Sequence, residues 1–150
     1  MARLFLTLVI FCGIVGIAWY AFERVAPNAT PPTGSSTVVS NVFSYNNTSA
    51  DTIFVSTPKP GSGTTEHIII NGFARGPWFT GEGTFPVIVM SADNVVIGSG
   101  QAHAGGDWTI SSFVPFVADM TLQSAYSGQV VVVLKNGAGN ASLSFPLSFN

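Results

Sequence analysis

Residues 68–116 alternate short apolar runs with turn residues, and this pattern restricts the fold more than any other feature of the chain. The runs are rich in Val, Ile and Phe, and Gly, Asp or Asn closes each of them. Runs of this length between turn residues are typical of β-strands joined by hairpins. The same stretch contains no cluster of nucleophile, base and acid. It therefore predicts an all-β module rather than a catalytic site.

Charged residues are unusually scarce. They make up 8% of the chain, against roughly 25% in an average protein, while apolar residues make up 47%. Such a composition indicates either a membrane segment or a β-sandwich with a surface of Ser, Thr, Asn and Gly, and both apply here. With five Lys and Arg and a net charge of −2, the chain lacks a basic surface for a phosphate backbone. We expect no binding to nucleic acid.

Residues 4–22 carry no charge, and their length is close to the roughly 20 residues that cross a bilayer core. Arg3 precedes the segment, and Trp19 and Tyr20 lie near its far end, which favours a cytoplasmic N-terminus. We therefore expect residues 1–26 to be a signal anchor, with a single-pass protein in the cell membrane and its domain on the extracytoplasmic side. A cleaved signal peptide is the alternative, although its apolar region usually spans only about 7 to 15 residues.

Cys12 lies within this apolar segment and is the only cysteine of the chain. We interpret it as an apolar residue of the segment, since the residues before it do not suit a lipoprotein cleavage site. The exported domain is thus expected to have no disulfide.

Residues 27–50 are rich in Pro, Ser, Thr and Asn. Because this composition cannot bury enough apolar surface to fold alone, it predicts a linker. Residues 38–45 interrupt the linker with apolar side chains and could pair as an extra edge strand. The folded domain is expected over residues 51–150.

The domain is predicted to contain seven strands. The last is the clearest, because Leu143, Phe145, Leu147 and Phe149 alternate with polar residues or Pro, a pattern typical of a half-buried strand. Residues 129–134 lack alternation and should be covered on both faces. The expected strands are Thr52–Ser56, His67–Ala74, Thr84–Ser91, Val95–Ala102, Ser112–Leu122, Gln129–Leu134 and Ala141–Phe149.

Turn residues and prolines divide these strands. Asp93-Asn94 and Asn136-Gly137 predict tight connections. Pro86, Pro115 and Pro146 interrupt three strands and should face an open edge or a bulge, because proline gives no ladder donor. Seven short strands over about 100 residues fit an immunoglobulin-like β-sandwich, and a small barrel is the alternative.

Several short motifs are the most specific features of residues 52–149. They are Gly72 with Ala74, Trp78-Phe79, Gly83 to Val89, Gly106-Asp107-Trp108 and Phe113 to Phe116. With these motifs the stretch resembles the immunoglobulin-like domain of bacterial spore germination proteins, which also occurs in other membrane-anchored bacterial proteins. The resemblance implies a sandwich fold and a non-catalytic extracytoplasmic role.

Metal and catalytic sites find little support in the sequence. His103 and Asp107 are close in sequence, and Glu66 adjoins His67, but no third ligand follows at a known spacing. Ser99 lies between two glycines without the full nucleophile-elbow motif. We expect no enzyme activity, no catalytic or metal-binding residues and no cofactor.

The candidate contact residues for a ligand or partner are Arg75, Trp78, Phe79, Asp107 and Trp108. Exposed Trp beside Arg or Asp would suit stacking on a sugar ring or anchoring a protein. The alternative, which we favour, is that both Trp close the ends of the core, since large aromatic side chains are usually mostly buried.

Two functions follow. The first is a membrane-anchored module with a structural or protein-interaction role in the bacterial cell envelope, whose partner is an envelope protein. The alternative is a carbohydrate or cell-wall binding module that uses exposed Trp side chains on wall glycan.

Overall fold

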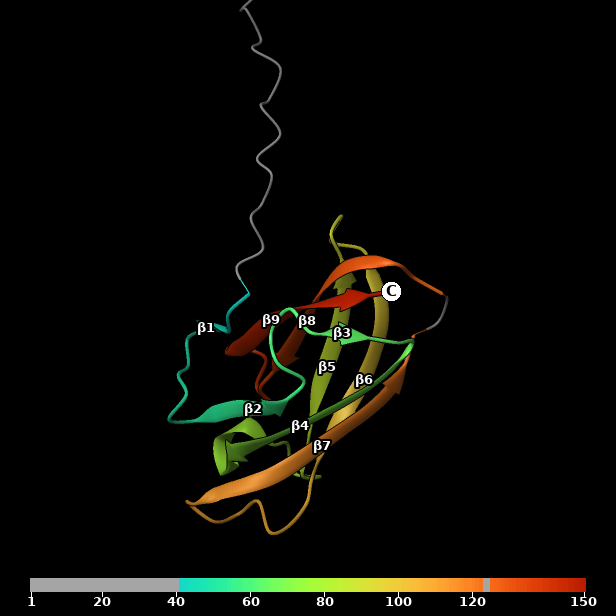
Figure 1. Ribbon diagram of the computed structural model, residues 1–150. Coiled ribbons are helices and arrows are strands. Elements are labelled where there is room, and N and C mark those ends of the chain that lie inside the picture. The colour runs from blue at the N-terminus through green and yellow to red at the C-terminus, as the bar shows by residue number, and fades with distance from the viewer. Residues whose placement is uncertain (1–40, 123–124) are drawn as a thin grey trace, which may run out of the picture. The chain divides into compact units, whose positions relative to one another are not determined.

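The computed structural model describes residues 41–122 and 125–150, and these form an all-β domain (Figure 1). The predicted anchor at residues 1–26 and most of the predicted linker lie outside the described residues. Within the described ranges, no helix has the length and apolar character needed to cross a bilayer. All described strands and the whole hydrophobic core lie in one compact unit, residues 39–150. This unit thus holds its own core.

The described residues form nine strands and one short 3-10 helix. Eight strands follow the order β1-β9-β8-β5-β6-β7-β4-β2 in one sheet, and β3 pairs with β9. All pairs are antiparallel except β3 with β9. The elements are β1 (Ser44–Asn46), β2 (Ile53–Thr57), β3 (Gly63–Thr64), β4 (His67–Arg75), η1 (Gly76–Trp78), β5 (Thr84–Ser91), β6 (Val96–Ala104), β7 (Phe113–Thr121), β8 (Gly128–Lys135) and β9 (Ser142–Phe149).

All seven predicted strands are present. Thr84–Ser91 has the predicted bounds, and each of the other six ends within two residues of its predicted limits. The two extra strands, β1 and β3, are short. β1 falls inside the predicted linker and joins the sheet because Phe43 and Tyr45 pack against the core, with the Phe43 ring 5.3 Å from that of Phe145. This burial raises the pKa of the Tyr45 phenol.

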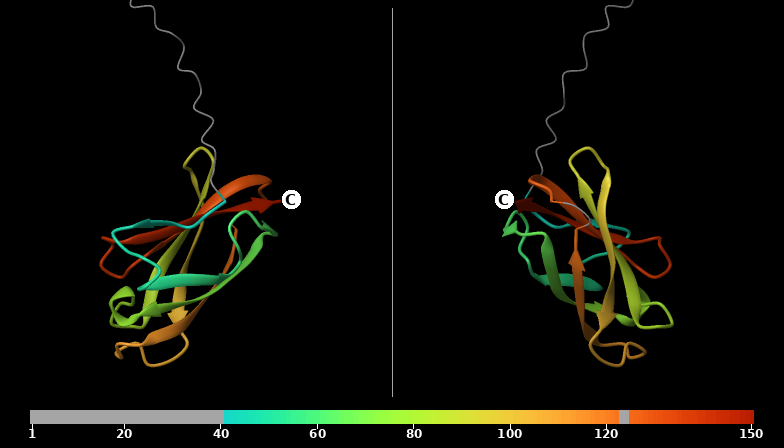
Figure 2. Two further views of the ribbon diagram at one scale, coloured as in Figure 1. Left: turned by 60° about the vertical axis from the view of Figure 1, so that its left-hand side comes forward. Right: turned by 90° about the vertical axis from the view of Figure 1, so that its right-hand side faces the viewer.

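The sheet curls, as Figure 2 shows. Side chains from β7 and β5 therefore meet in one core. The Phe116 ring on β7 lies edge-on to the Phe85 ring on β5, with centroids 4.9 Å apart. In β9, the predicted inward side chains are buried, with Leu143 at 0% and Phe145 at 1% exposure. Polar residues alternate with these apolar residues because the opposite face of β9 is partly open to water.

Each strand proline is paired on one side and lies at the end of a ladder on the other. Pro146 pairs with Val131 and lies between the short ladders that β1 and β3 form with β9, as expected for a position at an open edge. Pro86 pairs with Gln101 and lies just before the β5–β8 ladder. Pro115 pairs with Phe73 and lies just before the β6–β7 ladder. The predicted open edge or bulge is therefore wrong for Pro86 and Pro115, because β5 and β7 are interior strands.

Candidate functional site

Arg75, at the end of β4, joins three parts of the domain. Its Nε donates to the Asp51 carbonyl at 2.6 Å, and its Nη1 donates to the Ser111 carbonyl at 2.7 Å. The guanidinium also lies over the Phe113 ring, 4.4 Å from the centroid, a cation–π geometry. Since a guanidinium has five N–H donors, Arg75 keeps donors for a partner. Arg75 is therefore suited to contact a ligand or a protein partner.

Trp78 and Phe79 belong to the core. Their exposed fractions are 3% and 8%, and both rings pack against Phe85 at centroid distances of 5.6 and 5.4 Å. A buried ring cannot stack on a sugar. The two residues close one end of the core. This agrees for Trp78 with the favoured prediction that the Trp side chains close the core rather than contact a ligand.

Trp108 is half-buried and packs against the edge of the core. Its ring lies on Gly83, where the backbone has a φ of +71°, and a Cβ there would lie 2.6 Å from Trp108 Cε3. Gly83 therefore serves both a left-handed turn and close contact with the indole. Only part of the Trp108 ring is left for a ligand.

Asp107 organises its own turn. Its Oδ1 accepts hydrogen bonds from the Thr109 amide at 2.9 Å and from the Thr109 hydroxyl at 2.6 Å. These two bonds lower the pKa of the Asp107 carboxyl, because they stabilise the charged form. The residue is thus a turn-forming carboxylate, without a described contact to Trp108 or Arg75.

We expect Thr109→Val to raise the pKa of Asp107 toward its ordinary value of 3.8, because the hydroxyl donor is lost. Thr109→Ser keeps the donor and should leave the pKa unchanged. Because the folded pKa is the lower one, the stabilisation is present above the unfolded pKa and is lost as pH falls through the folded pKa. Carboxyl NMR titration measures both variants, and an unchanged pKa in the Val variant would contradict the assignment.

The histidines do not assemble a metal site. His67 Nε2 lies 2.6 Å from Asp119 Oδ1 on the domain surface, and His103 lies on β6 opposite Val117. Among residues 41–122 and 125–150, no three His, Cys, Asp or Glu side chains are grouped so that they could hold a metal ion. The pairing of His67 with Asp119 was not predicted, because it depends on the register of β4 and β7.

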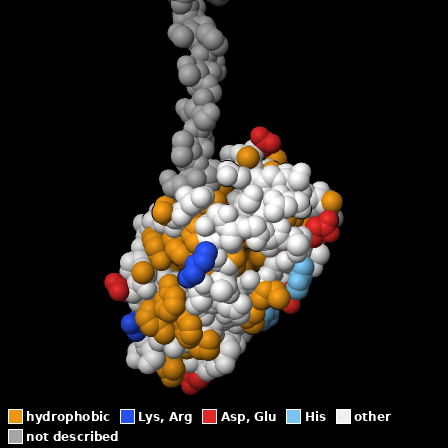
Figure 3. All heavy atoms as spheres, viewed as in Figure 1, with side chains coloured by type: hydrophobic (Ala, Val, Ile, Leu, Met, Phe, Trp, Pro, Cys, Tyr) orange, Lys and Arg blue, Asp and Glu red, His pale blue; other side chains and the backbone are white. Residues whose placement is uncertain are grey.

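The outward face of β2, β4 and β7 carries large apolar side chains at its surface. Ile69 is 47% exposed, Val117 41% and Phe73 37%. Figure 3 shows hydrophobic side chains gathered over the region where Figure 1 places β2, β4 and β7. We call this surface the aromatic face, and it consists of Phe54, Ile69, Phe73, Phe113, Pro115 and Val117.

Strand register brings these side chains together. Phe54 is paired with Phe73, and their rings stack with centroids 5.1 Å apart. Phe54 also meets the Phe113 ring edge-on at 5.3 Å, and Phe113 lies under Arg75. In residues 67–75 the outward set also holds three polar residues, His67, Asn71 and Arg75, and these were the sequence signal for its exposure. Only the register showed that Phe54 and Phe113 join Ile69 and Phe73 on this face.

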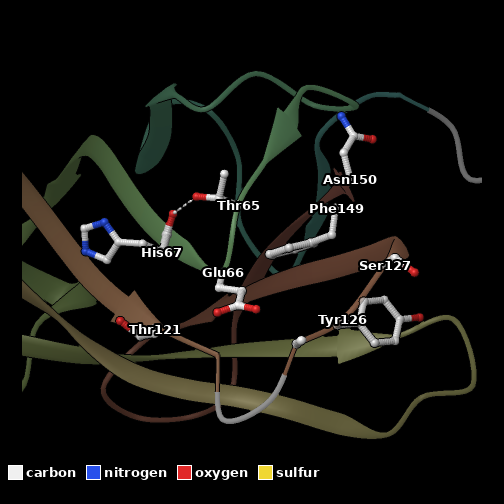
Figure 4. A pocket seen from close by; sticks show the side chains of 9 residues that line it. Thr65, Glu66, His67, Thr121, Tyr126, Ser127, Phe149 and Asn150 are labelled. Atoms are coloured by element: carbon white, nitrogen blue, oxygen red, sulfur yellow. Dashed lines mark hydrogen bonds between the residues drawn. The ribbon is translucent and has the colours of Figure 1, made fainter.

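Two pockets open at the ends of the domain. One, of about 460 Å³, lies beside Arg75 and Trp78 and is otherwise lined mainly by Asn, Ser and Thr. The other, of about 650 Å³, lies where β4 begins, with Glu66, His67 and Tyr126 in its wall (Figure 4). Across the described part of the chain, no buried side-chain polar atom lacks a hydrogen-bond partner. No unpaired buried polar side chain therefore indicates which class of ligand either pocket would bind.

The aromatic face, bordered by Arg75, is thus the best candidate site of the described domain. Compared with protein-family models, curated proteins and solved structures, the chain gives no match.

Proposed function

We propose that this chain is a membrane-anchored, extracytoplasmic immunoglobulin-like module with a non-catalytic protein-interaction role in the bacterial cell envelope. The observation that carries the proposal is the exposed aromatic face. Soluble domains rarely leave such contiguous apolar surface without a use, and patches of this kind mark interaction sites. Aromatic side chains and Arg are also the residues that dominate binding at protein interfaces.

The immunoglobulin-like part of the proposal is supported by strand order. In the immunoglobulin fold, strands A-B-E-D form one sheet and C-F-G the other. The order β2-β4-β7-β6 corresponds to A-B-E-D, and β5-β8-β9 corresponds to C-F-G. Here the ladder between β5 and β6 joins the two sets. The same order is consistent with the resemblance to the immunoglobulin-like domain of spore germination proteins.

The anchor and the location rest on the sequence. Residues 4–22 are uncharged and long enough for a bilayer, with interfacial aromatic residues at one end. If the anchor is present, the full-length protein should stay with membranes during alkaline carbonate extraction. Protease added outside the cell membrane should then digest the domain, and protection from that protease would reverse the proposed orientation.

A pull-down tests the interaction role. Immobilised residues 39–150 should retain a defined protein from detergent-solubilised envelope, and Val117→Lys should abolish retention because it places a charge in the middle of the aromatic face. Val96→Lys is the matched control, since Val96 is also an exposed strand valine, at 55%, but lies on β6 at the β5–β6 hairpin. Equal retention by both variants would exclude the aromatic face as the docking site.

The same experiment with isolated wall glycan tests the alternative. Glycan retention that is lost in a folded Trp108→Ala variant, and kept in Val117→Lys, would favour a carbohydrate-binding module. The burial of Trp78 already leaves such a module without a second stacking ring from the predicted pair.

A further inference from the structure

The residues of the aromatic face form rows across β4 and β7. Pairing in the register sets Arg75 beside Phe113, Phe73 beside Pro115, Asn71 beside Val117 and Ile69 beside Asp119. The apolar side chains occupy the rows from Phe113 to Val117, with Ile69 beyond them. Arg75 lies at one end of this face, and the His67–Asp119 pair lies at the other. Opposite charges therefore mark its two ends.

We propose that the aromatic face packs against the same face of a second copy of this chain, with the strands of the two copies antiparallel. This inference rests on the proposed interaction role and names its partner. In a two-fold arrangement centred on the Asn71–Val117 row, Val117 meets its own counterpart. Phe73 of one copy then lies over Ile69 of the other. The apolar rows of both copies are covered at once.

Charge complementarity selects the antiparallel orientation. When the strands of the two copies are antiparallel, Arg75 of one copy lies near the His67–Asp119 pair of the other. The two-fold symmetry forms this contact twice. Asp119 is 63% exposed, and its contact with His67 uses Oδ1, so Oδ2 can accept a hydrogen bond from a guanidinium. The parallel orientation would instead bury Asp119 against Ile69 without a cation, which costs free energy. Charged pairs of this kind fix register more than they add affinity.

The available area sets the strength of the contact. β4 and β7 have nine residues each, about 30 Å at roughly 3.4 Å per residue, and three strands about 4.8 Å apart are about 14 Å wide. The face therefore covers about 400 Å², roughly half of the 800 Å² per partner of a standard interface. We expect a dissociation constant of the order of 10 to 100 µM in solution. An anchor that holds copies in one membrane would raise their local concentration.

A bilayer is a less suitable occupant of this face. The chain has only five Lys and Arg and a net charge of −2, so it lacks the basic residues that attract anionic lipid. A sheet surface also suits another sheet, since two sheets pack face to face at a separation of about 10 Å. The second copy supplies both the apolar surface and the complementary charges.

The test uses two self-repelling variants. Residues 39–150 are suitable because they contain the entire described core. At pH 8, sedimentation equilibrium of the wild type should show a reversible dimer. Val117→Asp and Val117→Lys should each raise the dissociation constant at least 10-fold, because each places two like charges together at the symmetry axis. An equimolar mixture of the two variants should form a heterodimer with near wild-type affinity.

Val96→Asp and Val96→Lys are the matched controls and should dimerise like the wild type. A wild type that stays monomeric at 500 µM, or a mixture that fails to associate, would overturn the inference. If the monomeric wild type still retained an envelope protein that Val117→Lys loses, the proposed function would stand and only the second copy would be excluded. Binding of the wild type to phosphatidylcholine vesicles without dimerisation would likewise overturn it in favour of a membrane contact.

Discussion

Replacing Phe145 with Asp is expected to unfold the domain. The ring is 1% exposed and contacts Phe43, so the substitution removes a core aromatic side chain and puts an unpaired carboxylate in its place. Loss of the ring alone costs about 3 to 5 kcal/mol, and burial of a charge adds several more. Together these approach or exceed the roughly 5 to 15 kcal/mol by which a typical domain is stable.

Circular dichroism during thermal or urea unfolding measures the effect. Leu143→Asp, at a position with 0% exposure, should behave in the same way. Ser144→Asp is the control in the same strand, because its side chain points to the opposite, partly open face. A Phe145→Asp domain that melts like the wild type would show that the facing of β9 is misassigned.

Gly72→Ala is the second large effect, because there is no room for a Cβ at Gly72 between β2 and the Phe116 ring. A Cβ on Gly72 would clash with the Phe54 carbonyl oxygen of β2 and would lie 2.6 Å from Cζ of Phe116. The backbone oxygen cannot move without shifting β2, so the substitution should destabilise the domain by about 2 to 4 kcal/mol. Gly106→Ala is the control, since a Cβ on Gly106 would lie 4.0 Å from Val114 Cγ1.

A double variant separates the two contacts of Gly72. Phe116→Leu shortens the side chain and relieves the aromatic clash but not the clash with β2. If Gly72→Ala is as stable as the wild type in urea unfolding, the close approach of β2 to β4 is contradicted. If Gly72→Ala with Phe116→Leu recovers full stability, the ring rather than the backbone limits the space at this position.

The core and the aromatic face are built on the same strands. β4 lies between β2 and β7, so its inward residues Ile68 and Ile70 build the core while Ile69 and Phe73 build the aromatic face. Substitutions on the aromatic face should therefore leave stability nearly unchanged, because surface positions usually contribute within about 0.5 kcal/mol. This separation makes the binding tests interpretable.

Local patterns in the sequence predicted the strands well. Each of the seven predicted strands is present because short Val-, Ile- and Phe-rich runs bounded by turn residues have few other solutions. The alternation in β9 predicted the buried positions of Leu143 and Phe145, since side chains on a strand alternate between two faces. The apolar residues 38–45 suggested an extra edge strand, and β1 overlaps the end of that stretch at the edge of the sheet. β3 was not predicted, because two residues carry too little pattern.

The sequence by itself therefore determined the strand class of the domain, its turns and its apolar content. Only the tertiary structure decided which apolar side chains stay at the surface. His67–Arg75 carries apolar residues on both alternating faces, Ile68 and Ile70 on one and Ile69 and Phe73 on the other, and the curl of the sheet places only the first pair in the core. Register likewise pairs His67 with Asp119 and stacks Phe54 on Phe73. These contacts join residues far apart in the chain, so no local pattern encodes them.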